Sequence, residues 1–401
     1  MRILIVTQYF YPENFKSNDL AFELQKRNHN VSVLTGLPNY PEGKIYKDYG
    51  FFKKRKETIN GVKVYRSLIV PRGNGSGIRL FINYYSFAFL ASFKAFFLGL
   101  NNQYDLIIVH EPSPITQFYP ALLIKKIWKT PIYFWVMDLW PETLRVAGGI
   151  KNKLVLKYYE SVVTRFYNNS EKILITSKGF KGSIVSKGNF EEKVIYFPNW
   201  AEDVISTGDK RCTIPELPSG FKVMFAGNFG ESQDLENILN AFLELRACKN
   251  IKLILVGDGR KIGFIRNFID NKNLSETVFI AGKHPVEKMA GFFQQADAML
   301  IALKKDPVFS LTVPAKLQAY MSAGKPILAM IDGECGKIIN EADCGYAAQS
   351  GDYKMLSQNI LKMANSSRDE LARMGRNSKV YFENNFSLKE SITKLENILG
   401  R

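Results

Sequence analysis

Short apolar runs alternate with amphipathic stretches along both halves of the chain. In residues 1–200 the runs are rich in Val, Ile, Tyr and Phe, and some are continuous, as in strands of a parallel sheet. Between the first two runs, Leu20, Ala21 and Leu24 share one face of a helix predicted over Asn18–Arg27, which indicates a β-α-β unit. The strands predicted in this half are Arg2–Thr7, Val31–Thr35, Val62–Ser67, Leu106–His110, Ile132–Met137, Lys172–Thr176 and Val194–Phe197.

The pattern stops and then restarts near the middle of the chain. Pro198–Gly220 holds prolines, glycines and acidic residues without periodicity, which is typical of a linker. After it, strands alternate again with helices such as Asp234–Arg246. The strands predicted here are Val223–Ala226, Leu253–Val256, Val278–Ala281, Ala298–Ala302 and Ile327–Met330. Two successive strand–helix series predict an α/β protein with two doubly wound domains facing a cleft.

One segment, Phe81–Leu100, is apolar enough to raise the question of a membrane. Asn83, Ser86 and Lys94 interrupt it, whereas a spanning helix needs about 20 mostly apolar residues. We therefore expect a long core helix in preference to a membrane-contacting helix, and a true span least of all.

Composition and charge narrow the function classes. Hydrophobic residues make up 46% and charged residues 23% of the 401 residues, which excludes a disordered or collagenous chain. The net charge is +16, and residues 1–200 hold +14 of it. So uneven a charge predicts an anionic partner for the first half, such as a membrane surface, a phosphorylated lipid or a nucleic acid.

The sequence argues against a metal site and against secretion. Four scattered cysteines and three histidines argue against a zinc site, and so few thiols fit a reducing compartment. No D-x-D occurs, which disfavours a metal-bridged diphosphate and leaves Lys and Arg to neutralise one. The start, MRILIVTQYF, is expected to be a buried first strand and not a signal peptide.

Glycine turns distinguish the two halves. The turn after the first strand, Thr7–Asn18, has no glycine, which counts against a G-x-G-x-x-G nicotinamide enzyme. In the second half, Gly227, Asn228 and Gln233 follow one strand in G-N-F-G-E-S-Q, and Gly257–Lys261 (G-D-G-R-K) follows the next. Alone, each glycine turn is equally well explained as a tight capped turn. Together, the two turns favour a phosphate site, because they lie at neighbouring strand ends. The second turn consists of Gly257, Asp258, Gly259, Arg260 and Lys261.

A lysine near a helix start adds to that site. The stretch from Thr312 to Pro326 predicts a helix that begins near Pro314, a favoured first-turn residue. Lys316 then lies in the first turn, where the helix dipole disfavours a cation unless an anion is near. We therefore interpret Lys316 as a diphosphate ligand, although a lone lysine is more often a solvated surface residue.

Polar residues end two strands of the first half. His110 and Asp138 are expected at the C-terminal edge of the sheet, where such folds bind ligands. A hydrogen-bonded, half-buried histidine explains His110 equally well. Asp138 and Glu142 flank Trp140, and they either cap the following helix or form a functional carboxylate pair; the cost of burying them favours function.

These motifs together resemble glycosyltransferase family 4. The resemblance is carried by L-x-x-R-x-H-x-V-x-V-L-T in the first half and by G-N-x-G-x-x-Q, G-D-G, D-L-W-P-E and P-x-K-L-Q-x-Y-M-x-x-G-K-P. It covers essentially the whole chain and implies the GT-B fold and retaining sugar transfer from a nucleotide donor. Within the family, LTGLPNYPEG and the last two motifs look similar to N-acetyl-L-fucosamine transferases of bacterial O-antigen and capsule assembly.

The resemblance implies domain roles. Residues 1–200 would bind the acceptor, an undecaprenyl-diphosphate-linked saccharide, and residues 201–386 would bind the UDP-sugar, with a final helix near 387–401 packing back on the first domain. It implies catalytic roles for His110, Asp138 and Lys316, no cofactor and no metal. Its donor residues also include Lys283 and His284 near the uracil, Pro314 and Leu317. Its acceptor residues are Asn18, Asn39, Tyr40 and Glu142.

Two departures from the family pattern matter. The usual Glu-x7-Glu glutamates would fall near Leu311 and Ala319, and neither residue is acidic. Gln233 replaces the usual lysine after the first glycine turn, which leaves Arg260, Lys261 and Lys316 as candidate diphosphate cations. The donor contacts of those glutamates therefore do not carry over.

A membrane partner is also expected. Phe51–Lys56 (FFKKRK) sets aromatic residues beside four cations, and Phe81–Leu100 holds several more aromatics. We expect a peripheral protein on the cytoplasmic face, held at an anionic membrane surface by its first half. One alternative is a nucleic-acid-binding protein, but the sequence has no motif that reads nucleic acid, so no nucleic-acid partner is expected. The other alternative is a non-catalytic sugar-nucleotide sensor.

Overall fold

The computed structural model describes residues 1–146, 149–201 and 214–400. The chain divides into two units, each described here by itself. Unit 1 comprises Met1–Phe197 and Lys394–Arg401, and unit 2 comprises Pro198–Thr393. Of the predicted linker at 198–220, residues 202–213 lie outside the described residues.

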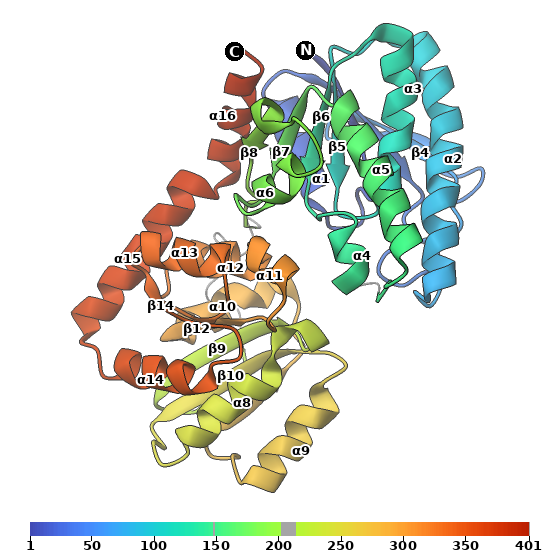
Figure 1. Cartoon of the computed structure of the whole chain (residues 1–401). Coiled ribbons are helices and arrows are strands. Elements are labelled where there is room, and N and C mark those ends of the chain that lie inside the picture. The colour runs from blue at the N-terminus through green and yellow to red at the C-terminus, as the bar shows by residue number, and fades with distance from the viewer. Residues whose placement is uncertain (147–148, 202–213, 401) are drawn as a thin grey trace. The chain divides into compact units, whose positions relative to one another are not determined.

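Unit 1 is built on a mostly parallel sheet in the order β3-β4-β2-β1-β5-β6-β7-β8 (Figure 1). All neighbouring strands pair in parallel except β3 and β4, which form a hairpin. The strands are β1 (Arg2–Val6), β2 (Asn30–Gly36), β3 (Lys56–Ile59), β4 (Val62–Ser67), β5 (Leu106–Glu111), β6 (Ile132–Val136), β7 (Lys172–Ile175) and β8 (Val194–Tyr196).

Strand β3 was not predicted from the sequence, because it is an edge strand without an apolar run. Its side chains alternate between exposed and half-buried, and Asn60 and Gly61, both at positive φ, form the turn to β4. An Asn-Gly pair is a strong signal of a β-hairpin. The turn sequence therefore indicates the β3–β4 hairpin, whereas the composition of β3 does not.

Helices cover both faces of this sheet. The helices of unit 1 are α1 (Lys16–Lys26), α2 (Gly77–Asn101), α3 (Tyr119–Trp128), α4 (Glu142–Val146), α5 (Lys153–Asn169) and α6 (Phe180–Val185), with 3-10 turns η1 (Ile115–Phe118) and η2 (Glu191–Lys193). Helix α2 lies beside α3 (Figure 1). It begins before the predicted start at Phe81, and much of its surface is exposed, so the expectation of a plain core helix is wrong.

Unit 2 contains a fully parallel sheet in the order β11-β10-β9-β12-β13-β14. Its strands are β9 (Phe221–Asn228), β10 (Ile251–Asp258), β11 (Val278–Gly282), β12 (Ala298–Ala302), β13 (Ile327–Met330) and β14 (Gly345–Ala348). Strand β14 was not predicted, since its sequence GYAA has no β-branched residue. The order reverses at β9, so the carboxyl ends of β9, β10 and β12 meet where open α/β sheets bind ligands.

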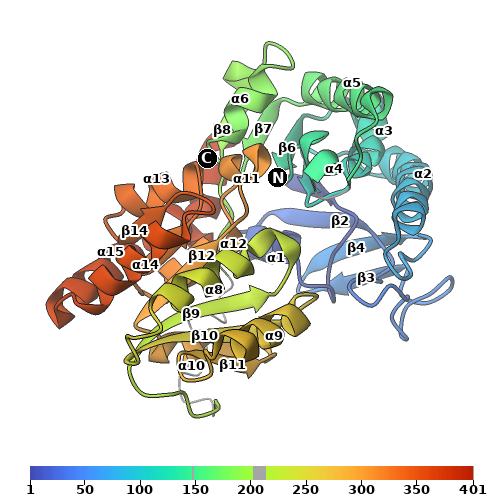
Figure 2. The same ribbon diagram turned by 60° about the horizontal axis from the view of Figure 1, so that its bottom comes forward.

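The core of unit 2 lies on both faces of this sheet, as alternate residues of β9 show. Val223 and Phe225 pack with α8, α9 and α14, whereas Met224 and Ala226 pack with α10, α12 and α13. Figure 2 shows these helices around the sheet. The helices are α8 (Leu235–Glu244), α9 (Ile262–Lys272), α10 (Met289–Gln295), α11 (Pro307–Leu311), α12 (Ala315–Ser322), α13 (Glu334–Glu341), α14 (Tyr353–Ala364), α15 (Arg368–Asn385) and α16 (Leu388–Ile398), with 3-10 turns η3 (Glu231–Gln233) and η4 (Val286–Lys288).

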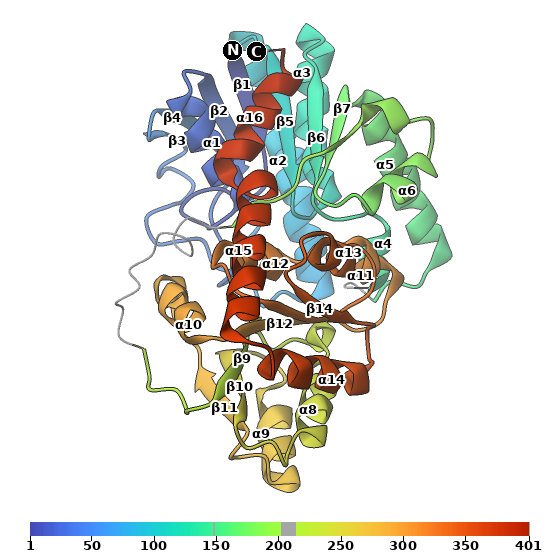
Figure 3. The ribbon, with the colours of Figure 1, turned by 90° about the vertical axis from the view of Figure 1, so that its left-hand side faces the viewer.

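The last part of α16 returns to unit 1 (Figure 3). Glu396 accepts a hydrogen bond from Arg27 at 2.6 Å and lies 3.3 Å from Nε2 of His29. Arg27 and His29 are the Arg and His of the L-x-x-R-x-H motif. That motif therefore joins the C-terminal helix to the end of α1 and the start of β2.

Candidate functional site

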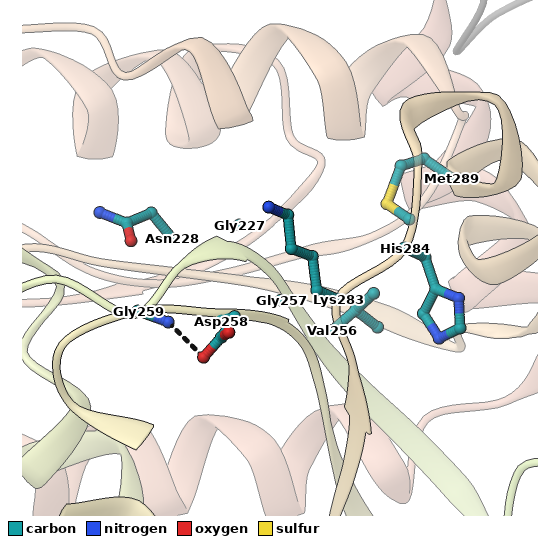
Figure 4. Close-up of a pocket in the computed structure, with 9 residues that line it drawn as sticks. All are labelled: Gly227, Asn228, Val256, Gly257, Asp258, Gly259, Lys283, His284 and Met289. Carbon is teal, nitrogen blue, oxygen red and sulfur yellow. Dashed lines mark hydrogen bonds between the residues drawn. The ribbon is translucent and has the colours of Figure 1, made fainter. Parts of the chain in front are cut away.

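A cavity of about 430 Å³ opens at the carboxyl ends of β9 and β10 in unit 2 (Figure 4). Both predicted glycine turns contribute to its wall, and so does the segment after β11. The lining residues are Gly227, Asn228, Val256, Gly257, Asp258, Gly259, Lys283, His284 and Met289. The structure thus brings together residues from three separate sequence motifs.

The two glycine turns pack directly against each other, which explains why glycine is required. Gly227 and Gly257 adopt φ of +142° and +143°. A Cβ at Gly257 would lie 1.9 Å from the carbonyl oxygen of Gly227, so any side chain there would clash with backbone. The Asp258 carboxylate accepts a hydrogen bond from Gly259 N at 2.7 Å and shapes the second turn.

Lys316 lies against the first of these turns. A Cβ at Gly227 would come within 2.7 Å of Lys316 Cε, so the lysine chain crosses the glycine face. Its Nζ donates to Oε1 of Gln233 and lies 3.7 Å from the centroid of the Phe225 ring. The first-turn position on α12 and the cation–π contact both place the charge beside the cavity wall.

Burial lowers the pKa of Lys316 to about 7. Gln233 and Phe225 are neutral, and no carboxylate is recorded beside the ammonium among the described residues. A partly desolvated ammonium without a counter-ion gains strongly from an incoming anion. This arrangement suits a phosphate-bearing ligand.

Tyr320 fixes the helix that carries Lys316, a role that sequence reasoning missed. Its hydroxyl donates to Ala226 O at 3.0 Å and accepts from Ala226 N at 2.9 Å. Tyr320 is one turn after Lys316, so both side chains face β9. The K-L-Q-x-Y spacing contained this signal.

The other predicted donor residues differ in position. Lys261 forms a 2.6 Å ion pair with Glu231, which also pairs with Lys304, so its charge is already neutralised at the surface. Arg260 is exposed and lies outside the cavity lining. Pro314 is the N-cap of α12. The side chain of Leu317 is wholly buried in the core, and the prediction that Leu317 binds the donor stays a prediction.

At the far wall, Lys283, His284 and Met289 extend from the segment after β11 (Figure 4). His284 Nε2 lies 2.9 Å from Ala281 O, and its ring packs on Phe292. Lys283 is exposed and adds a second cation to the cavity. These residues suit a planar group with polar edges and an anion.

In unit 1, Asp138 belongs to a hydrogen-bonded cluster at the carboxyl ends of β5 and β6. Ser113 Oγ donates to Asp138 at 2.6 Å, and Trp140 Nε1 donates to Ser113 Oγ at 3.0 Å. Burial raises the pKa of Asp138. The carboxylate that accompanies it is Glu111, which is fully buried, accepts from Ser113 N, and has its pKa raised well above normal by burial and by Asp138.

The predicted partner of Asp138, Glu142, is engaged elsewhere. Its Oε1 lies 2.5 Å from Lys187 Nζ and accepts from Ser183 at 2.7 Å. The hydrogen bond from Lys187 lowers the pKa of Glu142 against the effect of burial. The expected Asp138–Glu142 pair is therefore wrong, because the almost fully buried Lys187 needs a counter-ion.

His110 is wholly buried on β5, so its expected exposure to a sugar is not found. Its Nδ1 lies 3.2 Å from Thr7 Oγ1, and its ring packs against Trp135. Burial lowers the pKa of His110 to about 3, which keeps the imidazole neutral. The alternative of a hydrogen-bonded histidine describes His110 better, except that the side chain is wholly buried and not half-buried.

The predicted acceptor residues Asn18 and Asn39 are also buried, because they hold loops together. Asn18 accepts from Tyr11 N and donates to Glu13 O. Glu13, which sequence reasoning missed, accepts from the backbone N–H groups of Asn39 and Tyr40 at 2.8 and 2.7 Å. Burial raises the pKa of Glu13 to about 7.

Tyr40 keeps an exposed ring in this region. It packs edge-on against Tyr9 and Phe15, and the Arg72 guanidinium lies 4.9 Å from its ring centroid. Aromatic faces flanked by a cation suit a saccharide or its charged carrier. Of the four predicted acceptor residues, Tyr40 is the one whose placement fits that role directly.

No group of three or more His, Cys, Asp or Glu side chains converges as a metal site within residues 1–146, 149–201 and 214–400. Metal independence stays a prediction.

Two family models match the chain, one for each unit. Residues 17–200 match the glycosyl transferase 4-like domain, and residues 214–381 match the glycosyl transferases group 1 domain.

Curated relatives are about a quarter identical to this chain over the residues that align. One is the "Probable glycosyltransferase WbjE" of Pseudomonas aeruginosa, 24% identical over 271 residues, which are 65% of this chain and 66% of that protein. Another is the "Putative colanic acid biosynthesis glycosyl transferase WcaI" of Escherichia coli K12, 23% identical over 81% of this chain and 82% of that protein.

Solved structures share the fold. Anabaena Alr3699/HepE in complex with UDP superimposes with a TM-score of 0.73 at 12% identity over the whole of both chains. WaaG, described as a glycosyltransferase of lipopolysaccharide biosynthesis, gives 0.67 at 13% identity, again over both whole chains. These likenesses establish the GT-B fold, as the resemblance in the sequence implied.

Proposed function

We propose that this chain, in which residues 17–200 match the glycosyl transferase 4-like domain and residues 214–381 match the glycosyl transferases group 1 domain, is a retaining, metal-independent transferase that uses a UDP-sugar. The observation that carries this proposal is the unit 2 cavity. Two glycine turns line it, and Lys316, which has no carboxylate partner among the described residues, lies against one of these turns. UDP bound in related structures supports the choice of nucleotide.

In the proposed reaction, Lys316 stabilises the diphosphate while the bond from the sugar C1 to its phosphate oxygen breaks. The acceptor hydroxyl oxygen bonds to C1 on the same face. The hydroxyl proton passes to the departing diphosphate oxygen, so no separate strong base is needed. This accords with a neutral, buried His110 that has no access to an acceptor.

The finer parts of the proposal come from the sequence. We assign N-acetyl-L-fucosamine as the donor sugar and an undecaprenyl-diphosphate-linked saccharide of capsule or O-antigen synthesis as the acceptor, bound by unit 1. A lipid-linked acceptor would place the enzyme at the cytoplasmic face of the membrane. The relative named for colanic acid biosynthesis supports work on a surface polysaccharide.

A nucleotide panel tests the donor. UDP should raise the melting temperature more than ADP or GDP, because stabilisation follows the logarithm of ligand concentration over Kd. A larger shift with ADP or GDP would overturn the assignment.

Transfer assays with UDP-sugars, with and without EDTA, test the rest. Turnover that survives EDTA and a product with the donor's anomeric configuration by NMR are expected. UDP binding without transfer or hydrolysis of any UDP-sugar would indicate a sensor instead.

A further inference from the structure

Helix α2 presents most of its large apolar side chains outward, whereas its inward face consists mainly of small residues together with Phe87 and Leu98. The residues that pack on the domain include Ala88, Ala91, Ala95 and Gly99, whereas Phe89 is 74% and Phe93 is 65% exposed. The other large apolar side chains that α2 exposes are Ile78, Phe81, Ile82, Phe96, Phe97 and Leu100. We call this exposed set the α2 ridge.

The fold does not use the ridge. Close packing of α2 on α3 depends on small residues: a Cβ at Gly99 would already lie 3.0 Å from Ile127 Cδ1. Soluble proteins rarely expose a contiguous apolar surface of this kind without a partner. Successive ridge positions such as Ile78, Ile82, Phe89, Phe93, Phe96 and Leu100 are three, four or seven residues apart, so they lie on one face of the 25-residue helix.

Cations and further aromatics border the ridge. Lys94 of α2 donates to the carbonyl oxygens of Arg55 and Arg66 at 3.2 and 2.7 Å, which ties the basic loop 51–56 to the middle of the helix. In that loop Phe52 is 91% exposed beside Lys53 and Lys54. At the C-terminal end of α2, the half-exposed Trp128 donates to Gly99 O at 2.6 Å, next to Lys126 and Lys129 in sequence.

This chemistry favours a bilayer over a second copy of the chain. Helix α2 has no acidic residue, so it lacks the opposite charges that flank paired helices, and its stripe is rich in Phe instead of the Leu, Ile and Val of helix–helix seams. Aromatic and basic side chains are those that reside at a headgroup boundary.

Helix α2 is long and apolar enough to cross a membrane by length and composition. Its inner face, however, belongs to the folded unit: the buried Asn83 accepts from Gln8 and donates to Val70 O. A helix fixed on one side to a soluble sheet lies in the interface plane with its other side available to lipid.

We propose that the α2 ridge and the loop 51–56 form one surface that inserts shallowly into an anionic lipid bilayer. Its purpose rests on the proposed function, since it would bring unit 1 to a lipid-linked acceptor. The apolar ridge provides the part of the binding that salt does not screen, and the loop cations provide the screened part.

Sedimentation with vesicles tests the surface. The protein should bind phosphatidylcholine–phosphatidylglycerol vesicles more strongly than phosphatidylcholine vesicles, and part of the binding should persist at high salt. Phe89→Ser with Phe93→Ser should weaken binding at least about tenfold and abolish the salt-resistant part. Leu361→Ser with Val380→Ser, which removes exposed apolar side chains of unit 2, should leave binding unchanged.

Insertion depth gives a second readout that does not depend on loss of binding. Trp135, Trp140 and Trp200 are buried, so Phe93→Trp in a Trp128→Phe background reports on the ridge. Brominated lipids should quench its fluorescence. Absence of vesicle binding, unchanged binding of the double Ser variant, or absence of quenching would each overturn the proposal.

Two controls separate this inference from others. If sedimentation equilibrium shows a dimer that the double Ser variant dissociates, the ridge belongs to a second copy and the proposal is wrong. UDP stabilisation is measured on the same samples: loss of UDP binding with intact vesicle binding would refute the transferase proposal alone, and the reverse would refute the docking surface alone.

Discussion

The two units place opposite kinds of polar group at the carboxyl ends of their sheets. In unit 2 the strand ends carry glycine turns, and Lys316 of α12 lies against the first of them with no carboxylate partner among the residues that the structure describes. In unit 1 the strand ends carry Glu111 and Asp138, acids whose pKa values burial raises. One edge is prepared for an incoming anion, whereas the other holds acids that burial drives toward the neutral form. The difference supports the proposed diphosphate site in unit 2.

The largest expected effect is on that cation. Lys316→Ala should lower turnover by about 10²–10³-fold, because it removes a charge that stabilises the departing diphosphate. Initial rates with a UDP-sugar measure it. Lys304→Ala is the matched control, since this lysine pairs with Glu231 at the surface, and it should stay close to wild type. Near-normal turnover of a folded Lys316→Ala variant would remove Lys316 from the mechanism.

The glycine turn offers a steric test of the same edge. Gly257→Ala should lower the free energy of unfolding by roughly 1–3 kcal/mol and weaken UDP binding, because its Cβ would meet the Gly227 carbonyl. Denaturant melts and UDP titrations measure the two effects. Gly263→Ala, within α9 and with open space around it, should instead stabilise by about 0.5–1 kcal/mol. Equal effects of the two substitutions would contradict the packing argument.

The stability of unit 1 should depend on pH through the buried Glu13. Burial raises the pKa of Glu13 in the folded protein to about 7 from an ordinary 4.5. The protonated Glu13 therefore stabilises the folded state fully below pH 4.5, and this stabilisation is lost as the pH rises through 7. Glu13→Gln keeps the acceptor oxygen for Asn39 and Tyr40. It should match wild type near pH 4.5 and exceed it by up to about 3 kcal/mol above pH 7. A parallel pH dependence of unfolding in both proteins would show that Glu13 does not titrate this way.

The smallest effect is expected where α16 meets unit 1. Glu396→Gln should cost about 0.5–1 kcal/mol, since the Arg27 pair is partly exposed and screened. The loss should shrink as salt is added. A loss that does not change with salt would point to packing instead of charge.

The sequence predicted what local pattern encodes. Apolar runs located the buried strands, and the glycines after two of these strands line the unit 2 cavity, beside which the first-turn Lys316 lies. It missed β3 and β14, which lack such runs, and Glu13 and Glu111, whose environments come from distant segments. Asn18, Asn39 and His110 read as functional polar residues, yet their burial depends on partners such as Glu13 and Thr7 that only the tertiary fold brings close.

The central claim is that Lys316 receives the diphosphate, and calorimetry of UDP binding as a function of pH tests it most directly. With a free-state pKa of about 7 for Lys316, raised by the bound anion, affinity should weaken by up to about tenfold per pH unit above pH 7. Buffers of different ionisation enthalpy should reveal proton uptake above pH 7. Lys316→Ala should bind UDP more weakly and lose this pH dependence. A wild-type affinity that does not change between pH 6 and pH 9, or an unaltered profile in Lys316→Ala, would contradict the account.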